Sequence, residues 1–207
     1  MLYLSEINID FSKTQRFVLF DSYKWHKFIW KFFSNKESRN FLFRVDNTNV
    51  GCRIYIISHS EPNPQSGENY VSIRTKEIPE SFLERKRYFF KIRLNPVRTH
   101  VVRDPNTNER IKGGARLTVS PADLPVWINE KFLKSGMRIL HSPELGLECE
   151  ISPITKIYFK KNNNRAFHSS VDVSGILEVE DQEKFKLAFS NGIGHAKAFG
   201  FGLLILQ

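Results

Sequence analysis

The chain has 207 residues, of which 41% are hydrophobic and 13% aromatic, enough for the core of one large domain or two small ones. No apolar run approaches the roughly 18 residues that span a bilayer, and the N-terminus lacks the basic start and apolar stretch of a signal peptide. We therefore expect a cytoplasmic protein with no membrane partner. Cys52 and Cys149 are too few for a disulfide framework or a zinc site, and both are expected to be buried apolar residues.

Positive charge is concentrated in two blocks. The net charge at pH 7 is +9, and residues 85–116 hold ten Lys or Arg against only Asp104 and Glu109. A second block, with no acid between residues 151 and 171, consists of Lys156, Lys160, Lys161 and Arg165. Either block alone is often an ordinary solvated face, and neither has the periodicity of a membrane-surface helix. Together they indicate a polyanionic partner, because cations gain by releasing counterions from phosphates.

The first half of the chain predicts one helix among four strands. The expected elements are a strand at 3–9, a helix at 22–33, strands at 41–46 and 51–58 that form a hairpin, and a strand at 69–78. Asp21 and Ser22 are good N-caps for the helix. The order β-α-β-β-loop-β is that of a ferredoxin-like domain whose second helix is shortened or absent.

The second half repeats this outline without any sequence repeat. The expected elements are a long strand from Tyr88, a basic loop at 103–114, a strand after it, a helix at 123–134, strands at 156–160 and 167–180, a helix capped by Asp181 and ending near Ser190, and a terminal strand. The fold class is therefore predicted as α+β, with two tandem ferredoxin-like domains at residues 1–87 and 88–207.

The helix at 22–33 carries a candidate acid–base pair. On a helical wheel its buried arc consists of Trp25, Phe28, Ile29, Phe32 and Phe33, and its opposite arc of Tyr23, Lys27 and Trp30. His26 lies at the border, with Tyr23 three residues earlier on the same face. An imidazole with a pKa near ~6.5 suits proton transfer at neutral pH, and a phenol can orient a phosphate or a hydroxyl. Taken alone, such a pair is more often structural.

A second candidate lies near the C-terminus, where glycines are spaced as G-x-G-x5-G-x-G around Lys197. The glycines are Gly192, Gly194, Gly200 and Gly202. Glycines let the backbone turn tightly and bring N–H groups close to phosphates. A helix C-cap followed by a tight turn is the alternative.

Several segments resemble, in chain order, the CasE family, the repeat-processing endoribonucleases of type I-E CRISPR systems and subunits of the Cascade complex. They are Tyr23-x-x-His26-x-x-x-Trp30, FLFRVD, GCRIYIIS, FFKIRLNPVRT, GILEVED and GIGHAKAFGFGLLIL. The resemblance covers nearly the whole chain. It implies that the protein binds the stem-loop of CRISPR repeat RNA, cuts at the base of the hairpin without a metal or cofactor, and joins other Cascade subunits. The 2′-hydroxyl would attack the phosphate, leaving a 2′,3′-cyclic phosphate and a 5′-hydroxyl.

The resemblance also assigns residues. His26 falls on the family's catalytic histidine and Tyr23 on its partner, while His195 receives no catalytic role. The glycine-rich loop, both basic blocks and neighbouring lysines supply the expected RNA contacts, which are Lys27, Arg93, Arg98, Lys112, Arg116, Lys156, Lys160, Lys161, Arg165, Gly192, Gly194, Lys197, Gly200 and Gly202. The cation that stabilises the transition state is left open among Lys160, Lys161 and Arg165.

Two other functions remain. A non-cleaving RNA-binding scaffold subunit with the same fold is the main alternative, because charge and shape recognition of an A-form stem do not require catalysis. A DNA-binding regulator is weaker, since no helix-turn-helix or zinc pattern occurs. No group of carboxylates, Cys or His is spaced to hold Mg²⁺ or Zn²⁺.

Overall fold

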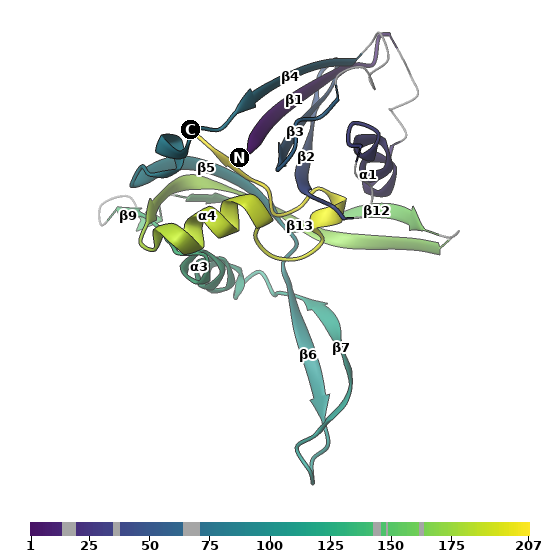
Figure 1. The fold of residues 1–207 in the computed structure, drawn as a ribbon. Helices are drawn as coiled ribbons and strands as arrows, with labels where there is room; N and C mark the ends of the chain where they lie inside the picture. The colour runs from purple at the N-terminus through teal and green to yellow at the C-terminus, as the bar shows by residue number, and fades with distance from the viewer. Residues whose placement is uncertain (14–19, 35–37, 64–70, 143–145, 148, 162–163) are drawn as a thin grey trace.

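A computed structural model describes residues 1–13, 20–34, 38–63, 71–142, 146–147, 149–161 and 164–207 (Figure 1). Only the backbone is described at residues 101–102, 110–115, 141–142, 146–147, 161 and 164. Two antiparallel sheets dominate, and their helices pack on the sheet faces. Within the described residues, no helix combines the length and apolar character needed to cross a membrane.

The first sheet is formed by strands from the first half of the chain, with helix α1 (Ser22–Trp30) packed on one face. Its strands are β1 (Tyr3–Asp10), β2 (Phe41–Thr48), β3 (Gly51–Ser58) and β4 (Val71–Glu77). Their spatial order is β2-β3-β1-β4, all antiparallel, which is the ferredoxin-like order expected from the sequence. Residues 59–63 after β3 are not helical, and residues 64–70 lie outside the described part.

The second sheet has the same plan. Its strands are β5 (Arg87–Leu94), β8 (Met137–Ile139), β11 (Cys149–Ile151), β13 (Asn164–Val179) and β14 (Leu204–Leu206), and its helices are α3 (Leu124–Lys134) and α4 (Gln182–Asn191). The path is β11-β13-β5-β14, with β8 also paired to β13. The predicted α+β class with tandem ferredoxin-like folds is therefore confirmed. The remaining short elements are α2 (Glu80–Leu83), β9 (His141–Ser142), β10 (Gly146–Leu147) and the 3₁₀ helix η2 (Lys197–Phe199).

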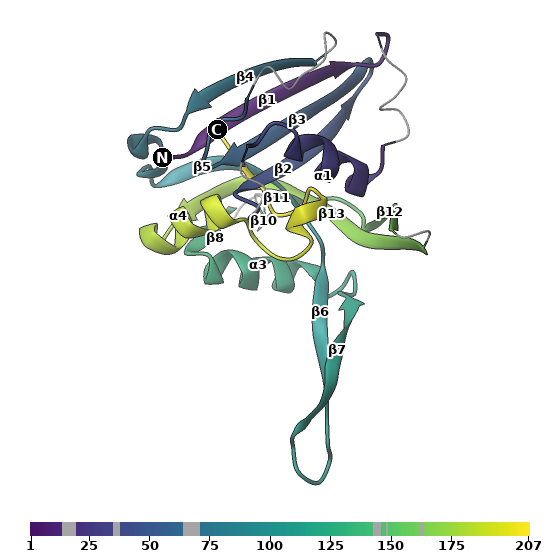
Figure 2. The ribbon, with the colours of Figure 1, turned by 45° about the vertical axis from the view of Figure 1, so that its right-hand side comes forward.

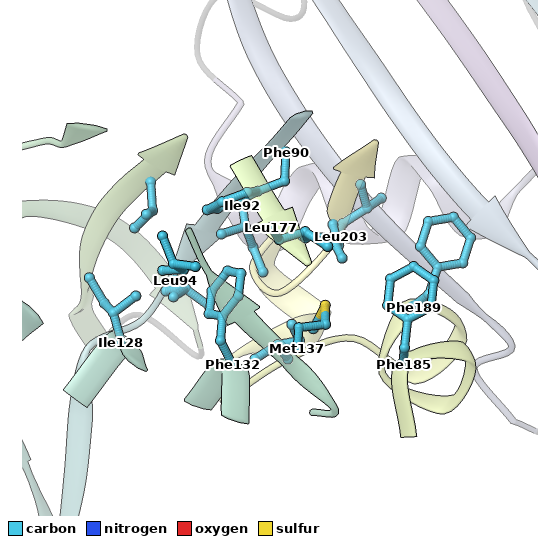
Figure 3. Close-up of a cluster of buried hydrophobic side chains, with 14 of the residues drawn as sticks. Phe90, Ile92, Leu94, Ile128, Phe132, Met137, Leu177, Phe185, Phe189 and Leu203 are labelled. Atoms are coloured by element: carbon cyan, nitrogen blue, oxygen red, sulfur yellow. The ribbon is translucent and has the colours of Figure 1, made fainter. Parts of the chain in front are cut away.

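Alternate side chains of β5 and β2 point to opposite faces of their sheets. On β5 the even-numbered positions 88–94 are buried, whereas Phe89 and Lys91 are exposed. Figure 3 shows the buried cluster, where Ile92 of β5 lies beside Leu177 of β13, and to which α3 and α4 also contribute side chains. On β2 the same alternation separates two environments: Phe41 and Phe43 pack in the core under α1, whereas Leu42 packs in the second core.

The first and second halves therefore share packing at β2. Leu42 and Ile57 of the first sheet belong to the same hydrophobic cluster as β5 and α4. The second sheet begins with β5 at Arg87. The boundary between domains at 1–87 and 88–207 stays a prediction about independent folding.

Two hairpins extend from the second sheet (Figures 1 and 2). The first is the arm, β6 (Val97–Arg103) with β7 (Arg110–Thr118), which projects away from the body. The second joins β12 (Thr155–Lys161) to the start of β13 and runs beside α1. The expected basic loop at 103–114 was wrong in extent: only residues 104–109 connect the strands, because the flanking residues pair as a ladder.

Two further expectations need correction. Helix α1 ends at Trp30 rather than Phe33, because the next amides bond to carbonyls three residues back, as Phe33 N does to Trp30 O at 3.2 Å. The short strands between residues 137 and 151 were missed, since two- and three-residue strands carry no readable alternation. Cys52 is buried and Cys149 half-buried, and burial raises the pKa of the Cys52 thiol to about 12.

Candidate active site

Helix α1 is held at its N-terminus by one carboxylate that also binds the β12–β13 hairpin. Asp21 Oδ1 accepts the backbone N–H groups of Tyr23 and Lys24, at 3.1 and 2.9 Å. This satisfies donors that a helix leaves free in its first turn. The other oxygen of Asp21 accepts the backbone N–H of Lys160 at 3.0 Å. The position of the hairpin is therefore tied to the helix that carries Tyr23 and His26.

His26 is half-buried against aromatic rings. The ring of Phe43 lies stacked at 6.3 Å between centroids and that of Phe41 tilted at 6.1 Å. Trp30 Nε1 donates a hydrogen bond to His26 Nε2 at 2.9 Å. Trp30 was expected on the arc opposite the core, but it packs edge-on against Phe41 at 5.3 Å. Residues four apart on a helix are neighbours, so this position suits the bond to His26.

These contacts favour the neutral form of His26. Burial, and then the positive charge of Arg39, lower the pKa of His26 below its usual 6.5. An indole N–H can only donate, so His26 Nε2 must present a lone pair and the proton of the neutral ring lies on Nδ1. That Nδ1 is buried and has no partner among the described residues. At neutral pH the imidazole can therefore accept a proton, but its lone pair is already engaged by Trp30.

Tyr23 and Lys27 form the outer side of this site. Lys27 Nζ lies 4.5 Å from the centre of the Tyr23 ring, a cation–π contact. Tyr23 is half-buried, and its hydroxyl makes no hydrogen bond within the described part of the chain. Tyr23 and His26 lie one helical turn apart. The phenol is thus available to a ligand beside the imidazole.

A cavity of about 260 Å³ lies at the foot of α1. Its walls come from the start of α1, from β2, from β12 and from the turn after η2, including Asp21, Phe43, Tyr158 and Gly200. A larger hollow of about 570 Å³ lies on the open face of the second sheet, near Phe89. Neither hollow is lined by His26 or Tyr23, but only the smaller one is walled by the helix that carries both residues. We therefore place the candidate site at α1. Within the described residues, no three His, Cys, Asp or Glu side chains converge on a point that could hold a metal.

The glycine-rich loop closes on itself beside this site. All four glycines have positive φ. At Gly202 an added Cβ would lie 2.4 Å from Ile193 O, so the close approach itself requires glycine. The N–H groups of Gly192 and Gly202 bond to Ala188 O and Arg93 O, both at 2.8 Å. For these two glycines, the expected N–H donation to phosphate is replaced by bonds within the protein.

Two half-buried cations belong to segments near His26: Arg39, whose charge acts on the imidazole, and Lys197 of η2, a helix that packs against α1. Lys197, at the start of η2, is half-buried, and burial followed by the charge of Arg39 lowers its pKa. Helix η2 packs against both α1 and β2. Arg39 was missed by the sequence analysis, because a lone arginine in a polar connection gives no signal of its own; only its place two residues before the matched segment FLFRVD could have pointed to it.

The second basic block lies on an exposed face of the β12–β13 hairpin. Lys156 Nζ lies 4.8 Å from the Phe167 ring and the Arg165 guanidinium 4.3 Å from the Tyr158 ring. Lys160 is exposed, and the side chain of Lys161 lies outside the described part. These cations therefore face solvent next to the start of α1.

The first basic block does not form one surface. Arg93 is only 20% exposed and pairs with Asp46 and Asp172 at 3.3 and 3.1 Å. Arg98 Nη2 lies 4.0 Å from Glu130 Oε2 at the base of the arm. Arg116 is exposed on β7, and the side chain of Lys112 lies outside the described part. Of these, Arg93 is the residue whose charge is already neutralised.

Two more histidines lie in this region: His168 on β13, which the sequence analysis did not single out, and His195 of the glycine-rich loop, to which it gave no catalytic role. His168 on β13 stacks on Phe159 at 4.8 Å, and its Nε2 is buried without a partner in the described part. Burial, followed by the charge of Arg116, lowers the pKa of His168 and of His195. We assign neither histidine a catalytic role, because aromatic rings pack against His168 and cations surround His195.

Comparisons with known proteins agree with this geometry. A family model described as CRISPR associated protein matches residues 2–207. The chain is 26% identical over 194 residues to the Cascade subunit CasE of Escherichia coli strain K12, covering 90% of this chain and 92% of that protein. Its fold is similar to Thermus thermophilus Cse3 bound to an RNA representing a pre-cleavage complex (TM-score 0.80, 22% identity, 100% and 98% covered). It is also similar to Cas6e of Escherichia coli K-12 (TM-score 0.67, 24% identity, 99% and 98% covered). The chain therefore belongs to the CRISPR associated protein family, and the resemblance to CasE expected from its motifs is confirmed.

Proposed function

We propose that this protein is an endoribonuclease that binds the stem-loop of CRISPR repeat RNA, cuts it at the base of the hairpin and remains bound as a Cascade subunit. The observation that carries the proposal is the neutral, half-buried His26, one helical turn from Tyr23. Helix α1 carries both residues and packs against β12 and η2, and all three elements carry cations. Similar proteins are named as a Cascade subunit and as RNA-bound endoribonucleases, which supports the substrate class.

The chemistry follows from the groups present. The 2′-hydroxyl of the nucleotide before the cut attacks the phosphorus, forming a bond from O2′ to phosphorus and breaking the bond to O5′. His26 takes the proton from the 2′-hydroxyl, because its lowered pKa keeps it neutral at pH 7. Tyr23 gives a proton to the departing 5′-oxygen. The products are a 2′,3′-cyclic phosphate and a 5′-hydroxyl, and the step uses neither metal nor cofactor.

Binding rests on exposed cations around the cavity at α1. The face of the β12–β13 hairpin that carries Lys156, Lys160 and Arg165 contacts stem phosphates, and the arm reaches further along the RNA through Arg98, Lys112 and Arg116. Lys27, Lys161 and Lys197 add charge near the cut, and Gly194 and Gly200 bring the backbone close to it. Arg93 is withdrawn from this set, since Asp46 and Asp172 already pair with it.

One observation favours a second function, a scaffold subunit that binds RNA without cutting it. In the structure the single lone pair of His26 is engaged by Trp30, and the opposite nitrogen is buried. A protein that kept this arrangement with RNA bound would have no base. The cleaving function requires the RNA to displace Trp30 from His26 or to change the tautomer.

One experiment separates these functions. Purified protein is incubated with the repeat hairpin in excess EDTA, in parallel with a hairpin that carries a single 2′-deoxy nucleotide before the cut. We expect the first RNA to be cut, with a cyclic phosphate detected by mass spectrometry, and the second to be bound and left whole. A scaffold binds both and cuts neither. Cutting that stops in EDTA and returns with Mg²⁺, or cutting of the 2′-deoxy hairpin, would show that water is the nucleophile.

A further inference from the structure

Arg39 lies near His26, and no described residue pairs with its charge. Its Nη1 is shielded from solvent and has no hydrogen-bond partner within the described residues. Burial is enough to lower the pKa of its guanidinium. Removing a cation from water is costly unless an anion or good acceptors compensate, so buried arginines are nearly always paired. An unpaired one suggests that its partner is a ligand.

The chain brings Arg39 to the same side as His26. Asn40 is held beside β3, because its carbonyl accepts the His59 N–H at 3.1 Å and its amide donates to Ser60 at 3.1 Å. The strand-like pairing of β2 therefore continues back past Phe41. Side chains alternate along such a segment, so Arg39 shares the side of Phe41 and Phe43. Both of these rings contact His26.

Electrostatics agree with this placement. The charge of Arg39 acts on the imidazole of His26 and also on the ammonium group of Lys197. Helix η2, which begins at Lys197, packs against both α1 and β2, so the segments that carry Arg39, His26 and Lys197 lie together. No carboxylate among the described residues pairs with Arg39 or Lys197. Arg39 and Lys197 thus form a half-buried, positively charged site near His26 that could bind an anion.

We propose that Arg39, with Lys197, binds the non-bridging oxygens of the phosphodiester that is cut at His26. The inference rests on the proposed function and names the cation that stabilises the transition state. Charge grows on those oxygens as O2′ bonds to phosphorus and O5′ departs, while one proton leaves the 2′-hydroxyl and another reaches O5′. A planar guanidinium can donate hydrogen bonds to two oxygens of one phosphate. Burial strengthens the interaction between its charge and those oxygens.

Lys160 and Arg165 are weaker choices for this role. Both are exposed, and Arg165 lies over the ring of Tyr158 on the solvent face of the hairpin. A solvated cation contributes less to a developing charge than a preorganised, half-buried one. Their position fits affinity for the stem rather than stabilisation at the phosphorus.

The test separates rate from affinity. Arg39→Ala, Arg39→Lys and, as a matched control, Arg53→Ala on β3 are compared by single-turnover cleavage at saturating protein and by binding of the 2′-deoxy hairpin. Arg53 is exposed and pairs only within the first sheet, so its variant should cut like wild type. We expect Arg39→Ala to lose ~10²–10³ in rate, as for loss of one oxyanion donor, with affinity within a few-fold. Arg39→Lys should restore part of the rate.

Two further readouts exclude a purely structural role. Low concentrations of guanidinium chloride should accelerate cleavage by Arg39→Ala, whereas sodium chloride at the same ionic strength should not. In an NMR titration the pKa of His26 should rise in Arg39→Ala, because a nearby positive charge is removed, and should not change in Arg53→Ala. The same NMR samples report whether the variant is folded.

The outcomes distinguish this inference from the proposed function. If wild type does not cut the hairpin in EDTA, the proposed function fails before Arg39 is considered. If wild type cuts and folded Arg39→Ala cuts within about threefold of it, the inference is overturned. It is overturned equally if the rate defect disappears at saturating protein, or if Arg39→Lys and added guanidinium both leave the rate unchanged.

Discussion

The arm and the β12–β13 hairpin leave the same sheet, are both rich in cations and yet relate differently to His26. The arm projects away from the body, and its tip, at residues 104–109, is remote from α1 (Figure 1). The β12–β13 hairpin is bonded to the cap of α1 through Lys160 and Asp21, and its Phe159 packs on Phe199 of η2. The arm can therefore affect only RNA binding, whereas the β12–β13 hairpin can also affect the alignment of the reacting atoms.

The comparison teaches that equal charge does not mean equal function. A cation on the arm adds to long-range attraction, which salt screens within ~10 Å at ordinary ionic strength. A cation beside α1 adds the same attraction and also fixes geometry at the site. Substitutions near α1 should therefore change the cleavage rate, and those on the arm should change affinity and its salt dependence.

The largest effect is expected at His26. His26→Ala should lower the single-turnover cleavage rate by ~10²–10⁴, because a positioned acid–base group is lost, and should leave hairpin affinity within a few-fold. Tyr23→Phe should be milder, since the ring still packs under Lys27. Gel analysis of cleavage and binding checks both. A larger defect in Tyr23→Phe than in His26→Ala would reverse their roles.

The next effect tests the bond between hairpin and helix. Asp21→Ala removes the cap of α1 and the acceptor of Lys160 N–H, so the cleavage rate should fall ~10- to 100-fold as the site loses alignment. Asp181→Ala is the matched control, because Asp181 caps α4 by accepting Lys184 N–H at 3.1 Å. Each variant should lose about 0.5–2 kcal/mol of folding free energy. Equal cleavage by the two folded variants would mean that hairpin docking does not matter for catalysis.

A smaller, pH-dependent effect is expected at Trp30. Its N–H stabilises neutral His26, so Trp30→Phe should raise the pKa of His26, the opposite of the lowering caused by burial and Arg39. A base must be neutral in the free protein, where Trp30 still bonds to it, so at subsaturating protein the acid limb of the rate profile should move to higher pH, and cleavage near pH 6 should drop several-fold. Profiles measured from pH 5 to 8 check this. A shift to lower pH would contradict the hydrogen-bond assignment.

The smallest effect distinguishes the two hairpins directly. Charges are removed from the arm by combining Arg103→Gln with Lys112→Ala. The slope of log affinity against log salt should fall by about one unit for each phosphate that the variant no longer neutralises. The cleavage rate at saturating protein should be nearly unchanged. Lys156→Ala with Lys160→Ala should reduce the slope similarly and also slow cleavage, because the Lys160 ammonium group holds RNA beside α1, while its backbone N–H still bonds to Asp21 in the variant. Identical rate effects from the two pairs would remove the difference between the hairpins.

The sequence predicted the architecture well because its signals are local. Alternation in β1 and β5 and the caps Asp21 and Asp181 are readable within a few residues. Two features were read incompletely. The basic loop of the arm was predicted too long, since glycines and charges hide the pairing of β7, and the short strands β8 and β11 owe their existence to pairing with β13.

The candidate site was predicted only in part. Tyr23 and His26 lie on one helix, so their proximity follows from helical spacing. Arg39 and Lys197 join them through tertiary packing of β2 and η2 on α1, which no local pattern encodes. The basic block at 85–116 shows the converse. Its cations are close in sequence but lie far apart in the fold. Arg93 is neutralised by Asp46 and Asp172, whereas Arg103 lies at the far end of the arm.

The hydrogen bond from Trp30 to His26 also has a consequence for selectivity between the repeat RNA and other transcripts. Every transcript in a cell offers the same 2′-hydroxyl and phosphodiester, so the reacting groups themselves give no selectivity. A resting enzyme whose base is engaged must use binding energy to free it, and one such hydrogen bond has a net worth of ~0.5–1.5 kcal/mol. A stem-loop that fits the hairpins can supply this energy, whereas a loosely bound transcript cannot. In the proposed mechanism, the Trp30 hydrogen bond would therefore slow cleavage of mismatched RNA by up to about one order of magnitude, since ~1.4 kcal/mol corresponds to a factor of ten.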